Sequence, residues 1–326
     1  MKKVAVSVAM VSVLAACGGG GDSSPSVPTD NRPSVALTVS NYEVAGKEVL
    51  GGSSNAGTLA DFSGFLTGAQ VSTGMTFPQF VQKRYPVALQ ATKQPAYLTG
   101  VEVSESETCS GGGSVRYSGS VRNEYNPSSG DVITITANNC REDGAVLNGA
   151  MTMRIGSVQG NIDSYPFSVT IDASTNDFRA SAGAVTYQSS GSMTMRVTNA
   201  SYSSADVSIT IPSMISSVSS GGKTDTFQYA NYKMDMSVRG STVSMTMNGG
   251  LTVPTLGGNQ LSIQTLQPFV STTGYPTSGV AAATTASGGK MRFTASSGSR
   301  VLIELDAAND GSYEASKLVA WNEVLF

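Results

Sequence analysis

Two short Ser-Gly-Gly-Lys segments come closest to a catalytic pattern in this 326-residue chain. They occupy Ser220–Lys223 and Ser287–Lys290, and a serine three residues before a lysine is the spacing of some acyl-transfer nucleophiles. Such a serine must open a buried helix, whereas glycine pairs between strand-like segments favour hairpin turns. The chain has no histidine, which excludes a Ser-His-Asp triad. We therefore expect neither catalysis nor a cofactor.

Asp306 and Asp310 are weak candidates for calcium ligands. They match the first and fifth positions of a calcium-binding loop, and Gly311 matches its sharp turn. The third position is Ala308, however, and the twelfth is Lys317 instead of glutamate. The simpler interpretation is an Asp-Gly turn before the last strand. The sequence therefore predicts no firm metal site.

Methionines recur in Met-x-Met pairs, which place two thioethers on one face of an extended strand. The pairs are Met151 and Met153, Met193 and Met195, Met234 and Met236, and Met245 and Met247. Filling of an apolar core is the favoured interpretation, because methionine adapts to irregular gaps. The alternatives are an apolar cavity for acyl chains and, less favoured, the capture of copper(I) by thioethers.

The chain has three cysteines, and Cys17 belongs to the N-terminal motif. Cys109 and Cys140 remain as an even pair. An even pair in an exported protein predicts one disulfide, which would close a loop of about 30 residues. A metal-binding or reactive pair is the alternative, and the lack of histidine and of a Cys-x-x-Cys spacing disfavours it.

Hydrophobic residues alternate with polar ones along most of the chain after residue 115. Ser, Thr, Arg, Lys and Asp occupy the opposite parity, which is typical of strands with one buried and one solvated face. The parity changes between Phe227-Tyr229 and Tyr232-Met234, so we expect a bulge near Ala230 and Asn231. About a dozen strands separated by turn residues predict an all-β fold, a large antiparallel meander folded into a sandwich or barrel-like sheet.

Residues 35–108 have a different pattern and are expected to pack on this sheet as an N-terminal segment before a β domain over 109–326. Val35, Leu37 and Val39 suggest a first strand. A capping Thr76 with Pro78, and Pro86 at the end, predict one short helix near 76–85. A weak repeat also links Met151, Met193 and Met234 at spacings of 42 and 41 residues, as a duplicated strand-turn-strand unit would.

The N-terminus carries the most specific motif. Lys2 and Lys3 precede an apolar run that ends in Leu14-Ala15-Ala16-Cys17, and the run is too short to span a bilayer. This segment resembles the lipobox of bacterial lipoproteins. The resemblance implies that residues 1–16 are a signal peptide removed before Cys17, and that Cys17 is diacylated on sulfur and acylated, for example with palmitate, on its new N-terminus. The alternative is an ordinary secretory signal cleaved after Ala16.

The residues after Cys17 fit a membrane tether. Residues 17–34 are rich in Gly, Ser and Pro, and such a segment has little to bury. In Gram-negative lipoproteins an Asp after the lipidated cysteine retains the protein at the inner membrane. Gly18 stands there instead, so the resemblance implies the outer membrane of the cell envelope.

Charge and composition narrow the partners. The net charge is −3, and no basic cluster follows Lys2 and Lys3, which argues against nucleic acid. We expect a lipid-anchored protein with a structural or binding role, whose partner beyond the membrane is a protein, glycan or lipid. The alternative is an acyl-chain carrier that wraps the methionine-lined face of a curled sheet around lipid.

Overall fold

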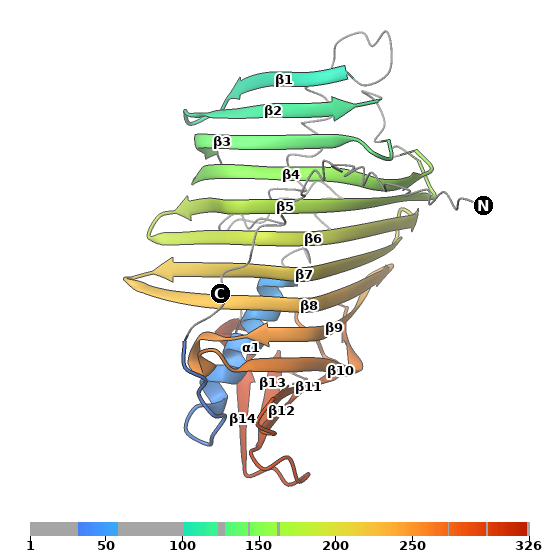
Figure 1. Cartoon of the computed structure of the whole chain (residues 1–326). Helices are drawn as coiled ribbons and strands as arrows, with labels where there is room; N and C mark the ends of the chain where they lie inside the picture. Colours follow the sequence, from blue (N-terminus) through green and yellow to red (C-terminus); the bar gives the residue numbers. More distant parts are fainter. Residues whose placement is uncertain are drawn as a thin grey trace, which may run out of the picture.

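The computed structural model describes residues 32–57, 101–122, 128–142, 144–161, 164–272, 274–297 and 299–324. Within these residues, fourteen strands form one antiparallel sheet in which each strand pairs with its neighbour in sequence (Figure 1). The strands are β1 Val101–Thr108, β2 Ser114–Val121, β3 Val132–Glu142, β4 Ala145–Gln159, β5 Phe167–Ala182, β6 Val185–Ser201, β7 Ser204–Ser220, β8 Lys223–Arg239, β9 Thr242–Thr252, β10 Gln260–Ser271, β11 Ser278–Thr285, β12 Lys290–Ser296, β13 Arg300–Asp306 and β14 Ala315–Ala320. The predicted all-β antiparallel meander is therefore confirmed.

In the described part of the chain, one α-helix and two short 3-10 helices accompany the sheet. They are α1 Tyr42–Gly57, η2 Pro254–Leu256 and η3 Trp321–Glu323. The sheet is open, because β1 and β14 form no ladder with each other in the described part of the chain. Within these same residues, no helix is long and apolar enough to cross a membrane.

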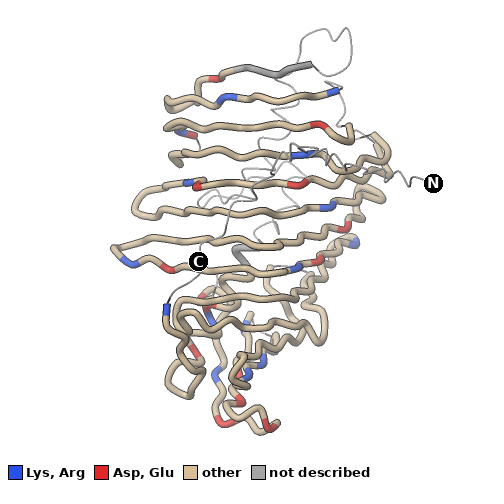
Figure 2. Tube along the Cα trace, in the orientation of Figure 1, with Lys and Arg blue, Asp and Glu red and all other residues tan. Residues whose placement is uncertain are grey.

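The sheet has one apolar and one polar face. Side chains of the same parity stand in rows across neighbouring strands, and one such row is buried from β5 to β9: Ile171, Met195, Ile209, Met234 and Met247. Residues of the other parity are mostly Ser and Thr. Charged residues are thinly spread over β2–β8 (Figure 2). The alternation in the sequence therefore separates a hydrocarbon core from a surface of hydroxyl groups.

A line of β-bulges crosses the long strands near their middle. The register shifts at Asn148–Ala150 in β4, Thr175–Phe178 in β5, Ser192–Thr194 in β6 and Ala230–Lys233 in β8. Glycine is needed beside this line: Gly149 has a φ of +106°, and a Cβ there would lie 2.7 Å from the carbonyl oxygen of Asp177. The bulge expected near Ala230 and Asn231 is confirmed, and Asn231 has a φ of +47°.

The weak sequence repeat corresponds to hairpins. Met151, Met193 and Met234 lie on β4, β6 and β8, which are alternate strands that run in the same direction. One repeat length therefore covers two strands and their turns. This agrees with a strand-turn-strand unit, because each copy places its methionines on the buried face at or just after a register shift.

Helix α1 fills the inside of a curl in the sheet. It lies against β8 and β9 and also against β12 and β13, and β9–β14 turn around it (Figure 1). Small residues allow this close contact: a Cβ on Gly46 would lie 2.8 Å from Ile303, and one on Gly52 would lie 2.8 Å from Phe227. The Tyr229 hydroxyl donates a 2.8 Å hydrogen bond to the carbonyl oxygen of Gly52.

The N-terminal segment differs from the expectation at residues 35–39 and at β1. Val35, Leu37 and Val39 do not form a strand, because only Ser34 makes an isolated bridge, with Gly257, and Val35 and Val39 are exposed. The described helix is α1, whereas the helix expected near 76–85 lies outside the described residues. The sheet also includes β1, so it starts at Val101 and not after residue 108.

Glu48 joins α1 to η2. Glu48 is 6% exposed, and its carboxylate accepts hydrogen bonds from the Thr255 backbone N–H at 2.8 Å and the Thr255 hydroxyl at 2.9 Å. Burial raises the pKa of Glu48, and the Thr255 hydrogen bonds offset part of this effect. The ionised form is therefore less favourable in the folded protein than in the unfolded chain.

We expect Glu48→Gln to remove a pH-dependent loss of stability. A raised folded-state pKa means that the contribution of Glu48 is fully present below its unfolded pKa, about 4.3, and is lost as pH rises through the folded value. Glutamine has no charge; its Oε1 can accept the Thr255 N–H hydrogen bond, and its Nε2 can donate to the Thr255 hydroxyl oxygen. Urea unfolding of both proteins from about pH 4 to about pH 8 should show the stability of the variant relative to the native protein rising with pH. A constant difference would contradict this assignment.

Candidate functional site

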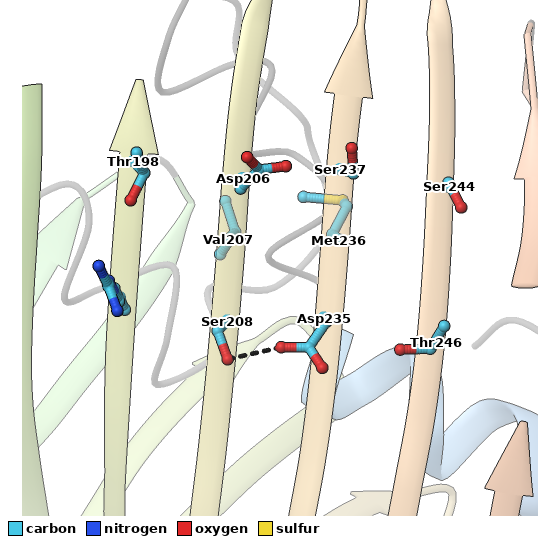
Figure 3. A pocket seen from close by; sticks show the side chains of 10 residues that line it. Thr198, Asp206, Val207, Ser208, Asp235, Met236, Ser237, Ser244 and Thr246 are labelled. Atoms are coloured by element: carbon cyan, nitrogen blue, oxygen red, sulfur yellow. Dashed lines mark hydrogen bonds between the residues drawn. The ribbon is translucent and has the colours of Figure 1, made fainter. Parts of the chain in front are cut away.

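The polar face of β6–β9 carries a shallow pocket of about 340 Å³ (Figure 3). Eight of its lining side chains form two adjacent rows of four across the strands. One row is Arg196, Ser208, Asp235 and Thr246, and the other is Thr198, Asp206, Ser237 and Ser244. Val207 and Met236, which are buried residues of the apolar parity, complete the lining. We call this site the β6–β9 pocket.

The two carboxylates of the β6–β9 pocket already have partners. Asp206 accepts hydrogen bonds from Arg239 at 2.7 and 2.8 Å. Asp235 accepts a 2.7 Å hydrogen bond from the Ser208 hydroxyl, which Figure 3 shows, and it forms a 2.8 Å ion pair with Lys233. These two acidic groups are thus engaged by neighbouring strand residues.

Arg196 differs from these charged neighbours. Its side chain is exposed, and it forms no ion pair with any residue in the described ranges. Asp172, on the neighbouring strand β5, accepts a 2.6 Å hydrogen bond from Thr194 instead. A guanidinium group has five N–H donors, so the pocket offers unused donor capacity beside the Ser and Thr hydroxyls.

The Met-x-Met residues meet on the apolar face. Seven of them are buried: Met151, Met153, Met193, Met195, Met234, Met236 and Met247. Met245 is partly buried and packs against the same core. Met234 stands directly opposite Met247, and Met236 opposite Met245, on strands β8 and β9. The thioethers are therefore distributed within a core of Ile, Val, Leu and aromatic residues.

The Asp306–Gly311 segment forms a turn around a buried carboxylate. Asp306 is 1% exposed and accepts hydrogen bonds from the backbone N–H groups of Asp310 at 3.0 Å and Gly311 at 2.9 Å. Glu314 is not among the candidates from the sequence. Its carboxylate lies with those of Asp306 and Asp310, and one oxygen of each lies within 4.8 Å of the others. It accepts a 2.9 Å hydrogen bond from the Ala307 N–H. These bonds give both carboxylates a role in the turn.

The remaining candidate residues have structural positions. Cys109 and Cys140 form the predicted disulfide, with 5.4 Å between their Cα atoms, and it joins the β1–β2 connection to β3. The Ser220–Lys223 segment is the turn between β7 and β8, with positive φ at Gly221 and Gly222. Ser287 and Gly288 likewise lie between β11 and β12. Cys17 lies outside the described residues.

Comparison with protein-family models, curated proteins and solved structures gives no match for this chain. The arrangement of the residues themselves is therefore the basis for a functional assignment. The sheet has a buried apolar face, with a helix inside its curl, and an exposed hydroxyl-rich face that carries the β6–β9 pocket.

Proposed function

We propose that this protein is an exported, lipid-anchored binding protein of the outer membrane, which presents the polar face of β6–β9 to its partner and has no catalytic role. One observation carries the proposal: the two faces of the sheet have separate environments. The apolar face is buried, while the polar face stays accessible and holds a pocket lined by hydrogen-bonding groups. Binding sites commonly combine a concavity with a few such groups.

The N-terminal motif supports the anchor in this proposal. Leu14-Ala15-Ala16-Cys17 provides the lipid attachment site, and the Gly/Ser/Pro-rich residues 17–34 provide reach between the membrane and the sheet. Two or three acyl chains hold a protein on a membrane far more firmly than one. A tether of this composition would leave the β6–β9 pocket free to meet a partner.

We expect Cys17→Ala to abolish fatty-acid labelling, because the sulfur and the new N-terminus that receive the acyl chains depend on this residue. Metabolic labelling with an alkyne fatty acid measures the effect. Ser24→Ala, in the same tether, is the matched control and should be labelled like the native protein. Gly18→Asp should keep its label but move the protein to the inner-membrane fraction. Unchanged labelling of Cys17→Ala would refute the anchor.

An acyl-chain carrier is less well supported than a binding protein. A carrier needs open space beside its apolar face, of several hundred Å³ for a ligand. Where β8–β14 curl, α1 lies in that space and contacts both sides of the curl. The methionines pack in cross-strand pairs with other core residues, which favours a filled interior.

A further inference from the structure

We propose that the β6–β9 pocket binds a carboxylated glycan, with the Arg196 guanidinium holding the sugar carboxylate and the Ser and Thr hydroxyls holding sugar hydroxyls. The inference rests on the proposed binding function and names its ligand class. The charges of the pocket, its unused hydrogen-bonding groups and the spacing of its rows all favour such a ligand.

One positive charge of the pocket has no ion-pair partner among the described residues. The lining holds one cation, Arg196, and two carboxylates, Asp206 and Asp235. Arg239 and Lys233 form ion pairs with these two carboxylates, which leaves the Arg196 guanidinium to pair with a ligand. A ligand carboxylate would provide that partner, because guanidinium and carboxylate groups match in a bidentate geometry.

The other free groups in the pocket favour a ligand rich in hydroxyls. Ser237, Ser244 and Thr246 line it without a side-chain hydrogen bond to any other described residue. Each hydroxyl can donate once and accept twice, which suits a partner that also both donates and accepts. No aromatic side chain lines the pocket, whereas the centres of protein–protein interfaces are enriched in Tyr, Trp and Phe.

The rows also suit an extended polymer. Neighbouring strands are about 4.8 Å apart, and same-face residues along a strand are about 6.7 Å apart. The row Arg196, Ser208, Asp235 and Thr246 therefore presents polar groups at regular intervals across four strands. A saccharide chain lying across β6–β9 would meet several of them in succession, so weak single contacts would add up.

Binding of oligogalacturonate to the full chain tests this inference, with the methyl-esterified oligosaccharide as the matched neutral probe. Isothermal titration calorimetry should detect binding of the free acid, and the ester should bind at least about tenfold more weakly. The reason is that hydrogen bonds to charged groups contribute more free energy than hydrogen bonds between neutral groups. Arg196→Gln should weaken acid binding by about tenfold or more, and Arg196→Lys by less. Affinity for the acid should also fall as salt is added.

Arg154→Gln is the control variant. Arg154 is an exposed arginine of β4 on the same face, outside the pocket, so its replacement should leave binding unchanged. Equal binding of acid and ester, unaffected by Arg196→Gln, would overturn the role of Arg196. Binding of neither probe would overturn the glycan assignment. Both results are distinct from a failure of the proposed function, which Cys17 labelling and the lipid content of the purified protein test separately.

Discussion

Met195→Ala is expected to lower the free energy of unfolding by about 2–5 kcal/mol, because it removes a buried side chain and leaves a cavity. Met195 is 3% exposed and stands in a buried row between Ile171 of β5 and Ile209 of β7. Its neighbours belong to paired strands and have limited freedom to collapse into the space. Urea denaturation followed by circular dichroism measures the loss.

Met245→Ala is the matched control for this prediction. Met245 is on the same face but only partly buried, so its truncation should cost clearly less. Met153→Ala, at a fully buried position on β4, should behave like Met195→Ala. If Met195→Ala and Met153→Ala leave stability unchanged and alter lipid binding instead, the methionine-lined face of the sheet lines a cavity. That result would support the carrier hypothesis.

Loss of the disulfide is the second large effect. Replacing Cys109 and Cys140 together by serine is expected to cost about 3–4 kcal/mol, because the bond restricts the unfolded chain over a separation of 31 residues. Both cysteines are buried, and the bond holds the β1–β2 connection near the open end of the sheet. Chemical denaturation of the double variant beside the oxidised native protein measures the difference.

Reduction of the native protein provides a control for the serine side chains. The reduced protein and the double variant should have similar stabilities if loss of the crosslink is the cause. Peptide mapping by mass spectrometry without reductant should find Cys109 and Cys140 joined in exported protein. Two free thiols, or a double variant as stable as the oxidised protein, would contradict the assigned role.

Alternation of residue types was sufficient to predict the antiparallel meander, because each long strand has one buried and one solvated face. The parity change after Tyr229 likewise located the bulge at Ala230 and Asn231. Helix α1 could not be found in this way. Its Gly46 and Gly52 lower helix propensity, and the reason for them is contact with Ile303 and Phe227, far away in the sequence.

The β6–β9 pocket was only partly predictable. Parity places Arg196 and Asp235 on the polar face, but their position in one row depends on pairing through Ser208. That register follows from bulges such as the one at Ser192–Thr194, and a shift by one residue would move every side chain to the other face. Lys233 and Arg239 pair with the two carboxylates of the pocket, and Arg196 does not. This distribution of ion pairs follows only from the assembled sheet.

An anchored binding protein with a filled apolar core should carry covalent lipid and no other lipid. Native mass spectrometry of the full-length gene product, extracted from membranes and released from detergent, tests this most directly. We predict the mass of the chain from Cys17 onward plus its covalent lipid, with no lipid bound non-covalently. A stoichiometric acyl lipid that stays with the folded protein and leaves on unfolding would contradict the proposed function and identify a carrier.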